Sequence, residues 1–295
     1  LMERRSTSMK TTALPYYEFR PGIYEIDEFA CVSMFLVVGE EKALLIDTGI
    51  GIGNLKAVIS RITDKPLVVA ASHNHLDHIG GADTFDSIWM CRSDIDDGKI
   101  KAASSLKDRR DYADFIKQRE NKWFPYDTNL EIQAWESVPV FQPMDDAHAF
   151  DLGNRKVVAY CCPGHTIGEM VFLDEKTKTL ICGDAINCNW YLDPSIGNSA
   201  HESLSMACDA MKRIESMSNQ YDYVINSHHD YREFGNQLNP DVLPNLHQCM
   251  KSLLDGTAQF KMVNDPMAQN GEKRVSAVKG DVEISVFSPL RVDQI

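Results

Sequence analysis

The sequence predicts an α/β sandwich, and three observations lead to this prediction. Apolar or alternating runs typical of β-strands recur in both halves of the chain, and helical patterns separate several of them. Of the 295 residues, 43% are hydrophobic, which is ample material for a large core. No internal repeat is evident, so we expect a single domain spanning residues 1–295.

The elements follow from local patterns in chain order. An alternating run, a nearly continuous apolar run and a short apolar run predict strands at 22–27, 31–38 and 43–46. Behind a glycine-rich turn, apolar residues at helical spacing predict a helix at 55–62, and a buried strand follows at 66–71. Later apolar runs predict strands at 156–161, 170–173, 179–182, 223–225 and 282–287. Helical patterns follow at 203–217 and 241–254.

The region from about 92 to 150 differs from the rest of the chain. Strand signals become sparse there, and helical, polar and aromatic residues prevail, which predicts a helical insertion. Eight aromatic residues lie within 112–150, about twice the average density of the chain. They form either a small satellite core or a pocket wall or dimer contact, surfaces that favour aromatic side chains. The candidates for the substrate pocket are Trp123 and Tyr126, together with Tyr191 further along the chain.

The charge balance restricts the classes of partner. The chain has 30 basic and 43 acidic residues and a formal net charge of −13, which argues against binding to nucleic acid or to an anionic membrane. Its longest nearly apolar run, 30–38, is far shorter than the roughly 20 residues that a membrane-spanning helix needs. We expect a small-molecule substrate, and the aromatic enrichment alone suggests a homodimer.

Cysteine usage suggests a compartment. The eight cysteines include no Cys-x-x-Cys pair, and several stand inside apolar runs, where reduced core thiols are expected. We therefore expect a cytoplasmic protein.

Four potential metal ligands follow the predicted strand at 66–71. His73, His75, Asp77 and His78 fall within six positions, just before two glycines. Alternate residues of an extended backbone share a face, so His73 and His75 can reach one metal ion together. Asp77 and His78 then turn toward a second position. Imidazole suits Zn²⁺ and other first-row metals, and a carboxylate adds an anionic oxygen.

Three further candidates occupy the same kind of position. His165, Asp184 and His228 each come just after a predicted strand, at 156–161, 179–182 and 223–225 respectively. Loops at one edge of a sheet converge on a common site, so this repeated placement predicts one shared metal centre.

Five signatures in this order resemble the metallo-β-lactamase superfamily, in particular its dinuclear group of glyoxalase II and lactonase type. They are Asp47 in LLIDTG, the His-x-His-x-Asp-His element at 73–78, Pro-Gly-His-Thr at 163–166, Gly-Asp at 183–184 and Ser-His at 227–228. The resemblance covers most of the chain. It implies an αββα sandwich of two mixed β-sheets flanked by helices, with a dinuclear metal site at the sheet edge.

The resemblance also implies a role for each residue. His73, His75 and His165 would hold the first metal, and Asp77, His78 and His228 the second. Asp184 would bridge both metals, and Asp47 would orient the ligand loops without binding metal. His229 is adjacent to His228, and the small residue Ser227 before it favours His228 as the ligand.

Such a site favours hydrolysis. Two divalent ions about 3.5–4 Å apart can share one hydroxide and keep it deprotonated near neutral pH. We therefore expect a metal-bridging hydroxide to attack a small ester, thioester or lactone, with Asp77 as the candidate to pass a proton to the leaving group. The expected cofactors are two Zn, with Mn or Fe as alternatives, because His and Asp ligands accept all three.

Two other activities stay open on the same ligand set. One is a phosphodiesterase that uses the same site, and the other is an iron-dependent redox enzyme of the same fold. The resemblance implies that opening of β-lactams is a poor match, because relatives with that activity usually lack a carboxylate at the position of Asp184.

Overall fold

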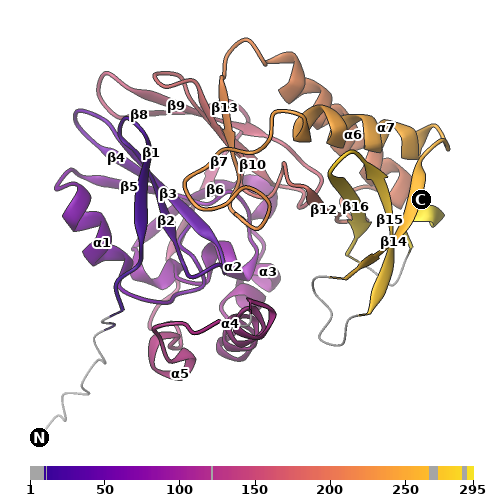
Figure 1. Cartoon of the computed structure of the whole chain (residues 1–295). Helices are drawn as coiled ribbons and strands as arrows, with labels where there is room; N and C mark the ends of the chain where they lie inside the picture. Colours follow the sequence, from indigo (N-terminus) through magenta and orange to yellow (C-terminus); the bar gives the residue numbers. More distant parts are fainter. Residues whose placement is uncertain (1–9, 11, 121, 266–271, 288–290) are drawn as a thin grey trace, which may run out of the picture.

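Three mixed β-sheets and their covering helices make up the computed structural model (Figure 1), which describes residues 10, 12–120, 122–265, 272–287 and 291–295. A seven-stranded sheet has the order β1-β2-β3-β4-β5-β6-β7, antiparallel from β1 to β4 and parallel from β4 to β7. A five-stranded sheet has the order β13-β11-β10-β9-β8, and a four-stranded sheet the order β12-β16-β15-β14.

The bounds of these elements are as follows. The first sheet comprises β1 (Tyr16–Arg20), β2 (Ile23–Asp27), β3 (Ser33–Val38), β4 (Ala43–Ile46), β5 (Leu67–Ala70), β6 (Ser87–Cys91) and β7 (Val140–Met144). The second comprises β8 (His148–Asp151), β9 (Lys156–Cys161), β10 (Met170–Asp174), β11 (Thr179–Ile181) and β13 (Tyr223–Ile225). The third comprises β12 (Asn189–Leu192), β14 (Gln259–Asn264), β15 (Lys273–Lys279) and β16 (Val282–Val286). The helices are α1 (Leu55–Ile62), α2 (Leu76–Ile79), α3 (Asp97–Ala103), α4 (Leu106–Glu120), α5 (Thr128–Glu131), α6 (Ala200–Ser216) and α7 (Val242–Leu254).

The first two sheets pack face to face, and helices cover their outer faces. One core cluster joins residues of both sheets, such as Phe35 and Phe172. A second cluster fills the space between the seven-stranded sheet and α1, α3 and α4, and a third lies under α6 and α7. This arrangement confirms the predicted αββα sandwich.

Strand β3 shows how the sequence produces these layers. Its first five residues are all buried, because both faces of the central sheet are covered. Successive side chains of a strand point to opposite faces. Accordingly Met34 and Leu36 belong to the cluster beneath the helices, whereas Phe35 and Val37 belong to the cluster between the sheets.

The layer opposite the seven-stranded sheet, predicted as one sheet, comprises two. After β11 the chain turns through Gly183, which has a φ of +51°, into the loop that carries Asp184. Strand β12 then pairs in parallel with β16 instead of extending the five-stranded sheet. The C-terminal strands therefore form a separate sheet beside α6 and α7 (Figure 1).

The predicted insertion at 92–150 is helical only in its first part. Helices α3, α4 and α5 lie between residues 97 and 131, but β7 and β8 occupy the end of the region. Strand β7 is an edge strand that contains Pro143. Proline lacks the N–H that an inner strand needs, and edge strands are largely exposed, so no continuous apolar run marks β7 in the sequence.

The helix at 55–62 has the predicted bounds. Asn54 caps it, because its side chain accepts a hydrogen bond of 3.0 Å from the N–H of Ala57. Its buried residues, Leu55, Val58 and Ile59, form the apolar stripe that the sequence indicated.

All eight cysteines are free thiols, and seven of them are buried, as expected for core thiols. Among the described residues, no helix is both long and apolar enough to cross a bilayer.

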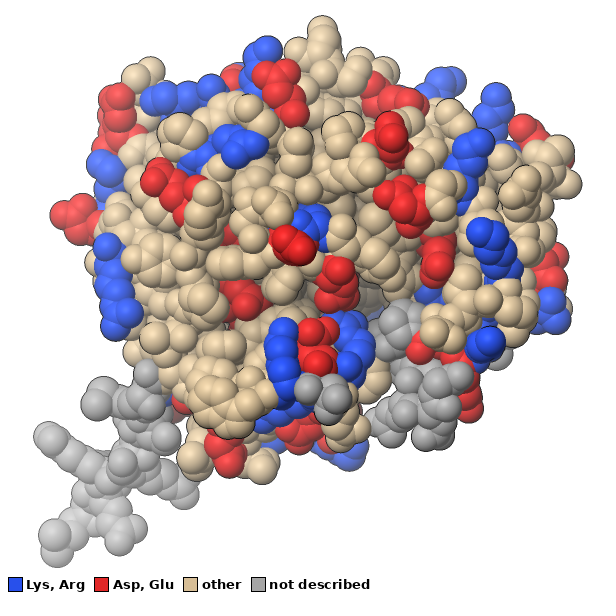
Figure 2. All heavy atoms as spheres, viewed as in Figure 1, with Lys and Arg blue, Asp and Glu red and all other residues tan. Residues whose placement is uncertain are grey.

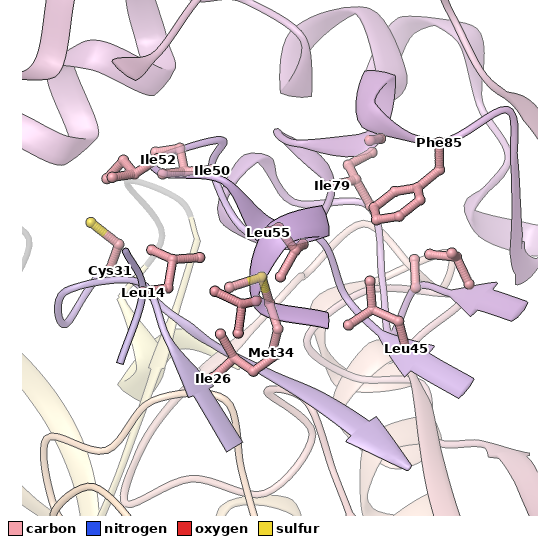
Figure 3. Packing of buried hydrophobic residues seen from close by; sticks show 14 of the residues in the cluster. Leu14, Ile26, Cys31, Met34, Leu45, Ile50, Ile52, Leu55, Ile79 and Phe85 are labelled. Carbon is pink, nitrogen blue, oxygen red and sulfur yellow. The ribbon is translucent and has the colours of Figure 1, made fainter. Parts of the chain in front are cut away.

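The core beneath the helices also fixes the backbone of the short helix α2. Ile79 is fully buried in this core near Phe85 (Figure 3). Thr48 donates its N–H to the carbonyl oxygen of His78 at 2.8 Å, and Gly49 forms a β-bridge with Ile79. The segment that carries Asp77 and His78 is thus tied to the end of β4.

Candidate metal centre

The seven predicted ligands come from four loops, and each loop follows a strand. Strand β5 leads to His73, His75 and helix α2, and the loops after β9, β11 and β13 carry His165, Asp184 and His228. The last two loops are joined, since Ser227 donates its N–H to the carbonyl oxygen of Gly183 at 2.9 Å. The backbone N–H of Ser33 in β3 donates to the carbonyl oxygen of Ser227 at 2.7 Å. This hydrogen bond joins the seven-stranded sheet to the loop after β13 beside the site.

The structure brings all seven side chains together in three overlapping groups. Within each group one ligand atom per residue lies within 4.8 Å of the others, and the groups are His73, His75 and His165; His73, His78 and Asp184; and Asp77, His78 and His228. In the first group, Nδ1 of His75 lies 3.0 Å from Nε2 of both His73 and His165. In the third, Oδ2 of Asp77 lies 3.4 Å from Nε2 of His228.

Asp184 stands between the two outer groups. Its Oδ2 lies 3.4 Å from Nε2 of His165, which belongs to the first group. The same oxygen lies 3.2 Å from Nε2 of His228 and 3.6 Å from Nε2 of His78, which belong to the third group. One carboxylate therefore faces both clusters of ligand atoms, the position that a bridging ligand requires.

The residues fit a pair of divalent cations. Nε2 of His78 and Oδ1 of Asp184 are buried and have no hydrogen-bond partner in the part of the chain that the structure describes. A buried polar atom without a partner costs about 1–3 kcal/mol, and a bound cation would remove that cost. Imidazole nitrogen and carboxylate oxygen are the donors that Zn, Mn and Fe accept, so the donor set does not select one of them.

The pKa values of the histidines differ between the two sides of the site: they are lowered for His73 and His165 and raised for His78. Burial holds the pKa of His73 and His165 well below its usual range, so both are neutral, as metal ligation requires. Burial also opposes the charged form of His78, but the carboxylates of Asp77 and Asp184 outweigh it and raise the pKa of His78 well above its usual value. Metal binding there would release a proton.

Asp184 is ionised despite its burial. Burial favours the neutral acid, but the neighbouring His228 and His78 hold the pKa of Asp184 well below its ordinary value. The protein therefore keeps a negative charge at the centre of the cluster.

Asp47 anchors the loop after β5 through hydrogen bonds to Ser72 and His78. It is fully buried, and its carboxylate accepts hydrogen bonds from the N–H of Ser72 at 2.7 Å and from the Ser72 hydroxyl at 2.8 Å. Oδ2 of Asp47 also lies 2.9 Å from Nδ1 of His78. A proton on Nδ1 leaves Nε2 free to face the cluster, so Asp47 orients His78.

Two other buried carboxylates were not expected from the sequence. Glu169 accepts the N–H of Asp184 at 3.0 Å, and its other oxygen lies 3.4 Å from Nδ1 of His73. Burial and the charge of Asp184 raise the pKa of Glu169 well above its usual range. Asp94 accepts hydrogen bonds from Asn74 and Thr166 and so links two ligand loops. Neither residue belongs to a recognisable motif, although an acidic residue directly before the apolar run at 170 is a signal for Glu169.

The adjacent histidines 228 and 229 have different partners. His228 belongs to the cluster, whereas Nε2 of His229 lies 3.0 Å from Oδ1 of Asp27, which is not one of the clustered residues. The geometry therefore favours His228 over His229 as a ligand.

A cleft of about 280 Å³ opens over the cluster. Tyr191, one of the candidates for the substrate pocket, lines it. The insertion contributes Tyr112 and Arg119 of α4, and the hydroxyl of Tyr112 donates to Oδ2 of Asp77 at 3.2 Å. Phe287 lines the cleft from the C-terminal sheet.

Trp123 and Tyr126 lie outside this cleft, and their assignment to the substrate pocket is corrected. Trp123 is 83% exposed and lines a separate hollow with Tyr126. The ring of Tyr126 packs against Phe29 at 5.2 Å between ring centroids, within the core beneath the helices. The hollow that these two residues line shares no residue with the cleft over the ligand cluster. The satellite-core alternative thus holds for Tyr126.

Comparisons with known proteins agree with this geometry. A family profile described as metallo-beta-lactamase superfamily matches residues 27–216. The chain is 24% identical over 199 residues to the acyl-coenzyme A thioesterase MBLAC2 of Homo sapiens, covering 59% of this chain and 68% of that protein. It is 25% identical over 160 residues to the probable metallo-hydrolase YybB of Bacillus subtilis, covering 52% and 61%.

Solved structures show the same fold. A metallo-beta-lactamase family protein from Thermus thermophilus aligns with a TM-score of 0.54 and 16% identity, over 80% of this chain and 82% of that one. A B3 metallo-beta-lactamase with an active-site glutamic acid aligns with a TM-score of 0.56 and 16% identity, over 87% and 94%. The chain belongs to the metallo-β-lactamase superfamily and is a metallohydrolase of that fold.

Proposed function

We propose that the protein hydrolyses acyl thioesters with the aid of two divalent metal ions, for which zinc is the first candidate. The observation that carries the proposal is the position of Asp184, whose Oδ2 faces both clusters of ligand atoms. When bound, two such ions polarise a carbonyl oxygen and make a water molecule acidic enough to attack. The similarity to acyl-coenzyme A thioesterases favours thioesters over other esters and lactones.

The side chains have separate tasks in this proposal. His73, His75 and His165 would hold one ion, and Asp77, His78 and His228 would hold the other. Asp184 would contact both ions, and Asp47 accepts a hydrogen bond from Nδ1 of His78, which would leave Nε2 of His78 free for metal. Asp77 lines the cleft, and its carboxylate would take the proton that the attacking water loses and pass it to the leaving thiolate.

The charges around the cleft weigh against a phosphodiester substrate. Among the described residues that line the cleft, Arg119 alone is permanently cationic, so a phosphodiester bound over the ligand cluster would meet a single guanidinium there. Figure 2 shows basic and acidic side chains interspersed over the face drawn there, without a broad basic area. This distribution supports a small-molecule substrate over a nucleic acid.

The test combines elemental analysis with a substrate panel. We expect about two metal ions per chain and the release of free thiol from an acyl-coenzyme A, faster than hydrolysis of a homoserine lactone or bis-p-nitrophenyl phosphate. His75→Ala and Asp184→Asn should each lower the metal content and reduce turnover by at least 100-fold.

Two surface substitutions of the same kind serve as controls. His201→Ala at the start of α6 and Asp255→Asn at the end of α7 are both exposed and should leave metal content and turnover unchanged. Unchanged turnover in His75→Ala and Asp184→Asn would contradict the metal-dependent reaction. A chain that binds iron and releases no thiol would favour the redox alternative.

A further inference from the structure

We propose that Phe287 and Tyr191 form the subsite for the acyl group, and that the substrate lies with its thiol portion toward Tyr112 and Arg119. This inference rests on the proposed thioester hydrolysis and adds the orientation of the substrate. Phe287 lies beside the first ligand group. The ring of Phe287 lies 5.0 Å from that of His165 and 5.6 Å from that of His75, between centroids.

The two aromatic rings form one apolar wall. Phe287 and Tyr191 are stacked with centroids 4.8 Å apart and an angle of 11° between their planes. Phe287 is nevertheless 42% exposed, although it lines a concave site. Exposed aromatic surface in a cleft is the kind of surface that an apolar ligand group covers, because its removal from water favours binding.

The wall is held in place by the C-terminal sheet. Strands β12 and β16 pair in parallel, and the N–H of Phe287 donates to the carbonyl oxygen of Leu192 at 2.9 Å. The guanidinium of Arg274 covers the Tyr191 ring at 4.4 Å. Arg274 is also hydrogen-bonded to Asp265 and Asn189, so its charge is engaged beside the wall rather than offered to the cleft.

The opposite end of the cleft is polar. The Tyr112 hydroxyl contacts Asp77, and the Arg119–Asp230 pair stands at the same end, with its side chains 25% and 32% exposed. Arg119 also lines the neighbouring hollow that contains Lys122 and His229, so this end continues outward along the surface.

A thioester has the same asymmetry as the cleft. Its acyl group is apolar, whereas the thiol portion of a carrier such as coenzyme A has amide and phosphate groups that need polar partners. The cleft of about 280 Å³ is at the lower limit of ligand pockets, which hold roughly 300–1,000 Å³. It accommodates the acyl group and the reacting bond, and the remainder of the carrier extends past Arg119.

The experiment compares Phe287→Ala with Phe260→Ala. Phe260 on β14 is 44% exposed, close to the value for Phe287, but lies outside the cleft. We expect Phe287→Ala to raise KM for hexanoyl- and benzoyl-coenzyme A about tenfold or more, with acetyl-coenzyme A changed less than threefold. Metal content and kcat should stay near the original values. Phe260→Ala should change none of these quantities.

A second comparison tests the orientation. Arg119→Gln should raise KM for hexanoyl-coenzyme A but leave KM for p-nitrophenyl hexanoate unchanged, because that ester has the same acyl group and no carrier. Phe287→Ala should raise KM for both substrates. The reverse pattern would overturn the proposed orientation.

Three further outcomes are decisive. If Phe287→Ala lost activity equally with all acyl groups and also bound less metal, Phe287 would support the metal centre, and the proposed subsite would be wrong. The proposed subsite would also be wrong if Phe287→Ala changed KM for none of the acyl groups. A lack of thioester hydrolysis in the unaltered protein would instead contradict the proposed function itself, and it is recognised before any variant is made.

Discussion

His228 and His229 are neighbours in the sequence, but their imidazole rings have different environments. Nε2 of His228 lies 3.2 Å from Asp184 and 3.4 Å from Asp77. His229 pairs with Asp27, which is not part of the ligand cluster. The two side chains therefore provide a matched pair for testing the ligand assignment, since they share one loop and nearly the same burial.

The substitution His228→Ala should remove about one metal ion per chain and reduce turnover at least 100-fold, because the third ligand group loses an imidazole. His229→Ala should keep both ions, since only the contact with Asp27 is lost. Elemental analysis of the two purified variants measures the difference directly. Loss of metal in His229→Ala with full retention in His228→Ala would reverse the assignment.

At this scale the clustering of the candidate ligands could be predicted, whereas most of the lining of the cleft could not. Four ligands fall within 73–78, so the backbone itself brings them together, and the other three belong to short motifs. Tyr112 and Phe287 reach the cleft only because α4 and the C-terminal sheet pack on either side of it. Trp123 was predicted from aromatic density alone, which does not specify the face to which a side chain points.

Among the elements, the glycine-rich turn before α1 shows how a loop depends on one buried carboxylate. Glu28 accepts the N–H groups of Ile50, Gly51 and Ile52 at 2.5, 2.9 and 2.5 Å. Gly49 has a φ of +71°, and a Cβ atom added there would stand 2.4 Å from Oε2 of Glu28. The turn thus requires glycine for both its backbone conformation and its close approach to Glu28.

Gly49→Ala should therefore lower the free energy of unfolding by more than the backbone strain alone, about 1–2 kcal/mol for a left-handed residue. Gly256→Ala is the control, because Gly256 has a φ of +67° and no atom within 4 Å of the added Cβ. Denaturant unfolding of both variants separates strain from steric conflict. Equal losses in the two variants would mean that Glu28 moves aside without cost.

Elements with a clear apolar pattern were predicted well, and elements without one were not. Strands β9 and β13 and helix α1 have the predicted bounds, because apolar runs mark the two strands and apolar residues at helical spacing mark the helix. Strand β14 is almost wholly exposed, and β7 contains a proline, so neither has an apolar run that distinguishes it from a loop. Their pairing is decided by neighbouring strands that are distant in the sequence.

For the whole molecule, the sandwich and the ligand cluster are one structural unit. The ligand loops leave strands of both packed sheets, and Ser227 connects them through hydrogen bonds to Ser33 and Gly183. The resemblance to a known family gave the layer order correctly. It did not predict the separate C-terminal sheet, because that sheet forms only when β12 pairs with β16, which is distant in the sequence.

Because the ligands come from both layers, metal binding should stabilise the entire fold. The unfolded chain does not bring the seven side chains together, so metal that binds the folded state shifts unfolding by mass action. The expected gain is about 2.7 kcal/mol when free metal reaches 100 times its dissociation constant. The midpoint of thermal unfolding should therefore shift to lower temperature after chelation and recover with added Zn²⁺.

Mg²⁺ should not restore the midpoint, because that ion prefers an all-oxygen shell and the cluster supplies mostly nitrogen. Asp184→Asn should respond to Zn²⁺ much less than the unaltered chain. A midpoint that is the same with Zn²⁺ and with chelator would show that the cluster does not bind the ion, since a ligand specific to the folded state always raises stability.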